Sequence, residues 1–325
     1  LDQKLYVSDK ARKQTGSRMF VEARSYVSVE DLIKGTIVSS GNDSAVVLAE
    51  GLGGTEKVFA AQMTQKAHEL GAKDTNFINA SGFPSEEHYS TVYDLAILSA
   101  ATIRDFPEFY SSYYHLDRYK YNGIEQPNRN TLLRYQRADY KVDGIKTGHT
   151  EAGGYGLAFS AIKDGTRVLG VINGVSSEKK RIKEARALIE WSLRQTRTFK
   201  LMVKSLNYFN LPVEGGESFE MKVSSLKDVY LSYLALSGLN SLSFRLETLK
   251  TKAPIAKGEH VANLFVDGGL VSNFKVPLFA SSEVKPRGLI SSLLAKAKAL
   301  FVAPEKKSQK DIVREIKDSL LMSVQ

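Results

Sequence analysis

Lys146, Thr147 and Gly148 stand side by side in a β-prone run of residues, 140–150. Lysine supplies a point charge for an anion, and threonine adds a hydroxyl donor. Glycine carries no side chain, so a ligand backbone can lie against the strand and pair with it as an added strand. The three residues therefore suit an extended peptide that ends in a carboxylate. The same pattern also fits an ordinary strand end, because a given three-residue word occurs by chance in about one chain in ten of this length.

A second polar triplet, Ser40-Gly41-Asn42, lies between two runs of apolar residues at helical spacing. One interpretation is purely structural: Gly41 ends the first helix, and Asn42 or Asp43 begins the second. The other interpretation is chemical: Ser40 relays a proton, and Asn42 presents an amide donor and acceptor to a cleft. The chemical interpretation requires the hydroxyl of Ser40 and the ammonium of Lys146 to meet in one groove.

The two triplets occur in the order of a known catalytic set. Ser-x-x-Lys, a Ser-x-Asn triplet and Lys-Thr-Gly together mark penicillin-binding proteins and serine β-lactamases. With Ser-Gly-Asn as the middle motif, the chain resembles the D-alanyl-D-alanine carboxypeptidases, the low-molecular-mass penicillin-binding proteins. The resemblance includes residues 33–43, 128–133 and 142–150, and also Arg181, which lies ten residues before Trp191. It extends from residue 1 to about residue 302.

This resemblance implies a hydrolase: a serine-type D-Ala-D-Ala carboxypeptidase that removes the terminal D-alanine from peptidoglycan stem peptides through an acyl-enzyme. The resemblance implies that Ser40 relays a proton to the leaving D-alanine and that Asn42 holds the substrate amide. The oxyanion would take backbone N–H bonds, one of them from His149. Stem peptides and β-lactam antibiotics are the implied partners, at the periplasmic or extracytoplasmic face of the inner membrane. The residues implied in substrate binding are Lys146, Thr147, Gly148, His149 and Arg181.

The chain departs from the family pattern at the nucleophile. The family has Ser-x-x-Lys before Ser-x-Asn, because the lysine one helical turn on can take the proton of the attacking serine. No such pair precedes Ser40; such words occur only after Lys-Thr-Gly, among them those that begin at Ser176, Ser177, Ser224 and Ser282. We therefore expect a fragment without the nucleophile helix and the first strands of the catalytic sheet, inactive by itself.

The elements that position these residues follow from the spacing of apolar side chains. Helices are predicted at 28–38, 44–50, 55–70, 91–104 and 179–193. Strands are predicted at 140–150, 155–162 and 167–172, with short β-like pieces at 4–7 and 19–21. The fold class is therefore α+β. The resemblance makes residues 1–198 a β-lactamase/transpeptidase-like domain, an antiparallel sheet with a helical subdomain whose first strands and nucleophile helix are missing.

The remaining residues predict two further parts. In residues 199–283, short β-prone runs alternate with glycine turns, which indicates a small all-β domain. Residues 284–325 predict a tail of amphipathic helices. An apolar stripe with a basic opposite side suits a helix that lies in a membrane surface, through residues 286–302. The stripe also suits packing on the β domain or on a twin chain, which would make the protein a homo-oligomer.

Composition excludes several kinds of site. The chain has 325 residues, no cysteine and a net charge of +9. Without cysteine it has no disulfide and no thiolate metal site. The five histidines show no ligand spacing, so we expect no metal and no cofactor. The positive charge favours an anionic partner, but it is scattered, with no RNA-binding motif and no basic block, which argues against nucleic acid.

Two alternatives stay open beside the carboxypeptidase. A serine β-lactamase shares the architecture, but the chain lacks the Glu-x-x-Leu-Asn word of the class A deacylation loop, and Ser-Gly-Asn favours the carboxypeptidase. A non-catalytic cell-wall protein that binds peptide or penicillin without a nucleophile also fits the sequence. Labelling with penicillin distinguishes such a non-catalytic protein from an enzyme, because only a protein with a nucleophile forms a covalent adduct.

Overall fold

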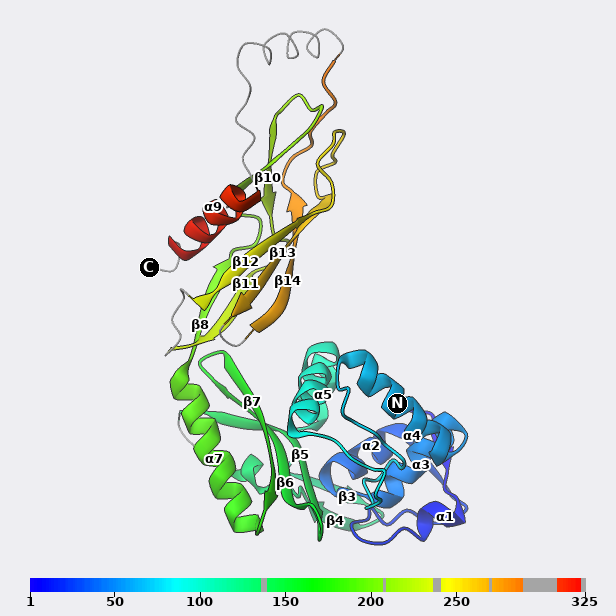
Figure 1. Cartoon of the computed structure of the whole chain (residues 1–325). Helices are drawn as coiled ribbons and strands as arrows, with labels where there is room; N and C mark the ends of the chain where they lie inside the picture. Colours follow the sequence, from blue (N-terminus) through cyan, green and yellow to red (C-terminus); the bar gives the residue numbers. More distant parts are fainter. Residues whose placement is uncertain (136–138, 207–208, 236–240, 269–270, 289–308, 323–325) are drawn as a thin grey trace. The chain divides into compact units, whose positions relative to one another are not determined.

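The computed structural model divides the chain into two compact units, Leu1–Arg194 and Gln195–Gln325 (Figure 1). It describes residues 1–135, 139–206, 209–235, 241–268, 271–288 and 309–322. The sequence analysis placed the boundary after residue 198. Helix α7 (Glu178–Gln195) passes directly into strand β8 (Thr196–Met202), which leaves no linker for a sequence pattern to mark.

The first half of the first unit is mostly helical, as the sequence predicts. Three of its helices begin at Ser28, Thr55 and Thr91, whose side chains each accept the N–H group three residues further on. The helix that begins at Thr55 ends at Gly71, whose φ of 103° favours a residue without Cβ. The elements are β1 (Lys4–Tyr6), α1 (Asp9–Arg12), β2 (Tyr26–Ser28), α2 (Val29–Val38), α3 (Asn42–Gly53), α4 (Glu56–Leu70), α5 (Val92–Asp105) and α6 (Pro107–Tyr113).

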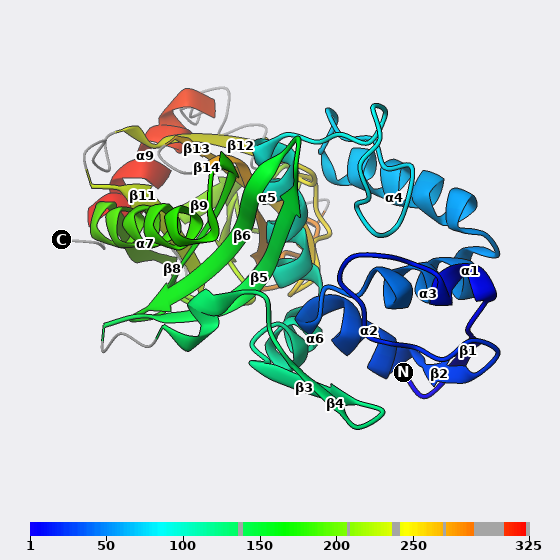
Figure 2. The same cartoon turned by 90° about the horizontal axis from the view of Figure 1, so that it is seen from below.

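An antiparallel three-stranded sheet, in the order β5-β6-β7, forms the second half of this unit. Helix α7 packs on this sheet, and its Ala185 and Ile189 share a buried cluster with Leu157 and Phe159. Helix α5 contacts β6 and β7 from the side away from α7 (Figure 2). The elements are β3 (Arg118–Tyr121), β4 (Ile124–Pro127), the 3₁₀ helix η1 (Thr131–Arg134), β5 (Lys141–Thr150), β6 (Gly154–Lys163) and β7 (Thr166–Val175).

Residues 19–21 do not form the β-like piece that their side chains predict. Their backbone N–H groups donate to the carboxylate of Asp43 instead of to a neighbouring strand. Phe20 also takes a left-handed φ of 72°, which breaks the extended conformation of a strand. The prediction was wrong because the partner of this backbone lies 22 to 24 residues away, where local patterns give no sign of it.

The second unit contains a five-stranded antiparallel sheet, in the order β12-β13-β14-β10-β9, and the antiparallel pair β11-β8. The all-β prediction for this region agrees with these strands. Their bounds are β9 (Phe209–Pro212), β10 (Glu220–Ser224), β11 (Val229–Leu234), β12 (Ser243–Thr248), β13 (His260–Gly268) and β14 (Val271–Ala280).

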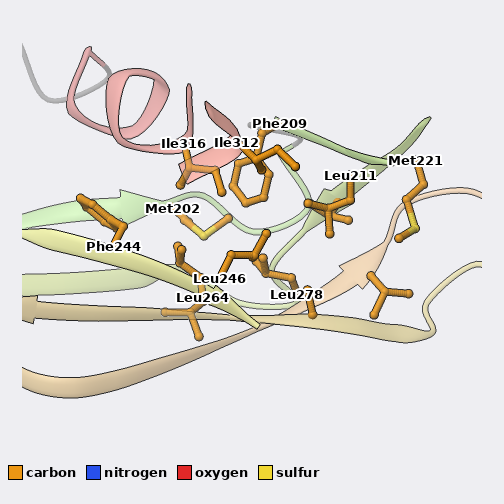
Figure 3. Close-up of a cluster of buried hydrophobic side chains, with 14 of the residues drawn as sticks. Met202, Phe209, Leu211, Met221, Phe244, Leu246, Leu264, Leu278, Ile312 and Ile316 are labelled. Carbon is orange, nitrogen blue, oxygen red and sulfur yellow. The ribbon is translucent and has the colours of Figure 1, made fainter. Parts of the chain in front are cut away.

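Helix α9 (Gln309–Met322) completes the core of the second unit (Figure 3). Its Ile312 and Ile316 are buried in one cluster with Phe209, Leu246 and Leu264. This segment, which the sequence analysis assigned to a separate tail, therefore packs on the β domain. The predicted membrane-surface segment, 286–302, lies mostly outside the described residues, because these include none of 289–308. Within the described residues, every helix is too short or too polar to cross a bilayer.

Candidate active site

Ser40 occupies a strained position between two helices. Ser39 ends α2, Gly41 precedes the first turn of α3, and Ser40 between them has a left-handed φ of 55°. A residue with Cβ pays about 1 kcal/mol or more for this conformation. Gly41 is required next to it, because a Cβ there would lie 2.5 Å from Ser44 Oγ and 3.0 Å from the backbone nitrogen of Met19. The caps are therefore Ser39 and Gly41, not Gly41 and Asn42 or Asp43 as the structural interpretation expects.

The buried carboxylate of Asp43 holds this loop in place. Its oxygens accept the backbone N–H groups of Met19, Phe20 and Val21 at 2.8, 2.8 and 3.2 Å. Oδ1 also accepts the N–H of Ser44 at 2.9 Å. Such a carboxylate, bound by several N–H groups, fixes two chain segments to each other. The start of α3 and the segment before Val21 therefore form one rigid wall.

Asn42 sits on this wall and is half-buried. Its backbone N–H donates to Ser17 O and its Nδ2 to Thr15 O, both at 2.8 Å. The side-chain nitrogen is thus already engaged within the protein. The carbonyl oxygen of Asn42 is then the atom suited to accept an N–H group from a ligand.

Lys146 reaches Ser40 from strand β5. Its Nζ donates to Ser40 Oγ at 2.6 Å and to the carbonyl oxygen of Thr147 at 3.1 Å. The two motifs, 106 positions apart in the sequence, therefore meet as the chemical interpretation requires. Burial, together with the positive charges of Arg129 and Arg181, lowers the pKa of Lys146 to about 8.

Arg181 brings a second cation to the same place from the first turns of α7. Its side chain is only 5% exposed, and its Nη2 pairs with Glu178 at 3.3 Å. Its Nε is buried without a hydrogen-bond acceptor among the described residues. Burial lowers the pKa of Arg181 from its usual value. A buried guanidinium with an unsatisfied N–H is a ready donor to an incoming anion.

Two aromatic rings line this end of the site. The guanidinium of Arg181 lies 5.7 Å from the centroid of the Tyr155 ring. The centroids of the His149 and Tyr155 rings are 3.9 Å apart, and the two residues are paired across β5 and β6. His149 is exposed and packs on Tyr155. Its side chain is therefore explained by this ring contact, while its backbone remains part of β5.

Every residue that the sequence analysis selected for the site lines one cavity of about 760 Å³. In the described part of the chain, no cluster of three or more histidine or acidic side chains could hold a metal ion. The serines that begin the Ser-x-x-Lys words named above, Ser176, Ser177, Ser224 and Ser282, do not line the cavity. The sequence-selected residues along its wall are Ser40, Asn42, Lys146, Thr147, Gly148, His149 and Arg181.

The sequence analysis missed other parts of the wall. Arg129 lines the cavity, yet it was noted only as a residue of the resemblance, without a role. Tyr155 and the turn at residues 80–84 also line it. The sequence signal for Arg129 was its place between Asn128 and Asn130. If both asparagine side chains are buried and hold the turn, the side chain between them faces away from the core.

Comparison with known proteins decides the family. The family model Peptidase_S11, described as D-alanyl-D-alanine carboxypeptidase, matches residues 1–177 of this chain. The chain belongs to this family. The D-alanyl-D-alanine carboxypeptidase DacA of Haemophilus influenzae is 34% identical over 252 residues, 76% of this chain and 63% of that protein. DacA of Escherichia coli is 32% identical over 289 residues, 88% of this chain and 70% of that protein.

Solved structures of related carboxypeptidases and penicillin-binding proteins have the same fold. Penicillin binding protein 5 from Haemophilus influenzae matches with a TM-score of 0.71 at 31% identity, over 87% of this chain and 83% of that one. PBP3 from Streptococcus pneumoniae matches with a TM-score of 0.73 at 22% identity, over 88% and 86%. The predicted family and α+β class are thus confirmed. The chain spans 63% of the length of the Haemophilus DacA protein.

Proposed function

We propose that this protein acts as a D-Ala-D-Ala carboxypeptidase on peptidoglycan stem peptides, and that the cavity of the first unit binds the terminal D-alanine. The observation that carries the proposal is the 2.6 Å hydrogen bond between Lys146 Nζ and Ser40 Oγ. This bond places a cation and a hydroxyl together beside the buried guanidinium of Arg181. Among the described residues, an uncharged ligand would leave Lys146 without a counter-charge and the buried Nε of Arg181 without an acceptor, so a carboxylate is the favoured occupant.

The strand β5 suits the backbone of an extended peptide. It is an outer strand that pairs with β6 in the described sheet, and its residues 146–150 line the cavity. A Cβ added at Gly148 would meet nothing within 4 Å, so the space beside the strand is open there. A peptide that pairs along β5 brings its C-terminal carboxylate to Lys146, Thr147 and Arg181.

Ser40 is suited to move a proton at the leaving nitrogen. Its oxygen accepts from Lys146, which leaves its own hydrogen for a group in the cavity. When the C–N bond of the terminal D-alanine breaks, the leaving amine takes the hydrogen of Ser40, and Lys146 replaces it. The lowered pKa of Lys146 makes this replacement easier at neutral pH.

The acylation step is not assigned to a residue of these 325. The serines that line the cavity are Ser17, Ser40 and Ser81, and none has a lysine three residues on. This observation favours a second candidate, a non-catalytic protein that binds cell-wall peptides or penicillin reversibly. A covalent penicillin adduct on the chain supports the enzyme, whereas reversible binding alone supports the second candidate.

Peptide binding tests the proposal directly. We expect N-acetyl-L-Gln-D-Ala-D-Ala to bind the full 325-residue chain, and its C-terminal carboxamide to bind about tenfold or more weakly, because a hydrogen bond to a charged group contributes about 1.5–3 kcal/mol. Isothermal titration calorimetry at pH 7 measures both affinities. Equal affinities for acid and amide would contradict the assignment of Lys146 and Arg181 to the carboxylate.

The remaining partners belong to the same proposal. β-Lactam antibiotics are expected to enter the cavity as analogues of the D-Ala-D-Ala end, at an extracytoplasmic face of the inner membrane. The net charge of +9 supports contact with anionic lipid headgroups, through residues 286–302. Removing the whole segment 286–325 is a poor test of that contact, because it would also remove Ile312 and Ile316 from the core of the second unit.

A further inference from the structure

Strand β5 has one residue more than its partner β6 in the stretch that leads to Lys146. Val142 pairs with Ala161 of β6. Lys146, four residues after Val142, pairs with Ala158, which is only three residues before Ala161. The extra residue is Asp143, at the register shift that follows Val142. One unpaired residue of this kind is a β-bulge, which changes the direction of the side chains beyond it.

This bulge decides which face of the sheet carries Lys146. Ala161 lies in the buried cluster beneath α7, and Ala158, three residues away in an alternating strand, lies on the opposite face. Lys146 therefore points away from α7, and its ammonium reaches Ser40. In a regular strand, Lys146 would share the face of Val142, which belongs to the cluster with α7.

Two side chains bind the carboxylate of the extra residue. Arg167 Nη1, from β7, donates to both oxygens of Asp143, at 2.9 and 2.8 Å. The hydroxyl of Tyr110, from α6, donates to Asp143 Oδ1 at 3.1 Å. Arg167 also donates to Ser160 Oγ of β6, and its guanidinium lies 5.4 Å from the centroid of the Tyr110 ring. These contacts join α6 and all three strands of the sheet at the bulge.

The network is largely removed from solvent. Tyr110 is 2% exposed, and the side chain of Asp143 is 13% exposed. Burial and the charge of Asp143 raise the pKa of Tyr110, so its hydroxyl keeps the hydrogen that it donates. Tyr110 also packs directly on the strand backbone, because a Cβ at Gly144 would collide with its hydroxyl. The bulge is therefore held by packing as well as by charge.

Lys146 needs such a constraint. Burial disfavours its charged form, which means that the ammonium by itself would be more stable in water than beside Ser40. Tyr110, Asp143 and Arg167 do not line the cavity, so they act on a ligand only through the strand.

We propose that Tyr110, Asp143 and Arg167 are positioning residues, which hold the bulge of β5 and thereby direct the ammonium of Lys146 to Ser40. The part that Lys146 plays in peptide binding rests on the proposed function. The place of its ammonium is a property of the free protein and is measured without a peptide.

The titration of the Lys146 ammonium reports this place. In the full chain with ¹³C-labelled lysine, each Cε resonance follows the protonation of its own ammonium, and the resonance that is absent from Lys146→Met belongs to Lys146. We expect a midpoint at about pH 8 in the native chain. An ammonium released into solvent has a pKa near the ordinary lysine value of 10.5.

Three variants test the network. Asp143→Ala combined with Arg167→Ala removes the ion pair without leaving one charge buried alone. In this double variant we expect the midpoint to rise by about one pH unit or more, and the affinity for N-acetyl-L-Gln-D-Ala-D-Ala to fall by about tenfold. Tyr110→Phe is expected to raise the midpoint by less. Tyr119→Phe is the matched control: it removes a hydroxyl that donates to Asp31 at 2.8 Å, and the midpoint is expected to stay.

The midpoint separates positioning from support of the fold. A purely structural network would lower the free energy of unfolding and leave Lys146 in place, so a midpoint still near pH 8 in the folded double variant overturns the inference. If the double variant does not fold, equal midpoints in Tyr110→Phe, Tyr119→Phe and the native chain overturn it. A native chain that does not bind the peptide refutes the proposed function, while the titration still decides what holds Lys146.

Discussion

Lys146→Met is expected to weaken the binding of N-acetyl-L-Gln-D-Ala-D-Ala by about tenfold to a hundredfold at pH 7, since the lost charge-assisted bond contributes about 1.5–3 kcal/mol. The same variant is expected to be at least as stable as the native chain. Burial lowers the pKa of Lys146, which means that the fold disfavours its charged form. Calorimetry measures the affinity, and urea denaturation measures the free energy of unfolding.

Lys141→Met is the matched control for that result. Lys141 begins the same strand, β5, but it is exposed and does not line the cavity. Its replacement is expected to change the affinity less than twofold. Unchanged binding in Lys146→Met would show that the ammonium beside Ser40 does not hold the ligand.

Asp43→Ala is expected to lower the free energy of unfolding of the first unit by about 3–5 kcal/mol, because it leaves backbone N–H groups in the protein without their acceptor. The carboxylate of Asp43 is 1% exposed and accepts the N–H groups of Met19, Phe20 and Val21. Trp191, the only tryptophan, lies in α7 of this unit, so its fluorescence in urea reports the transition.

Two further variants serve as controls for the loss of stability expected for Asp43→Ala. Asp43→Asn keeps one acceptor oxygen and is expected to lose less stability than Asp43→Ala. Asp9→Ala removes a carboxylate that is 56% exposed and paired with Arg24, and is expected to cost less than about 1 kcal/mol. Equal small effects at Asp43 and Asp9 would contradict the role of Asp43 as the support of the Ser40 loop.

Sequence patterns predict the elements of this protein where the physics is local. Ser28, Thr55 and Thr91 cap helices with side chains that sit three residues from their partners, and Gly71 ends a helix by its own conformational freedom. The turn at Asp164-Gly165 follows in the same way, since both residues have positive φ in the structure. Each of these signals needs only neighbouring residues.

Other features depend on contacts that are distant in the sequence. Met19–Val21 has apolar side chains typical of a strand, but its backbone is bound by Asp43. The stripe of Ile312 and Ile316 predicts a helix without saying which surface covers it, and the structure places these residues in the β core. The meeting of Ser40 and Lys146 was predictable only because two motifs together identified a family.

The pH dependence of peptide affinity tests the central claim most directly, namely that the ammonium of Lys146 beside Ser40 binds the terminal carboxylate. The pKa of Lys146 is about 8 in the free protein, and a bound carboxylate raises it because opposite charges favour the charged form. The affinity for N-acetyl-L-Gln-D-Ala-D-Ala is therefore expected to be constant from pH 6 to about 7.5 and to fall above pH 8, by up to about tenfold per pH unit. The C-terminal carboxamide is expected to show no such fall. An affinity for the acid that stays constant from pH 7 to 10 would contradict the account.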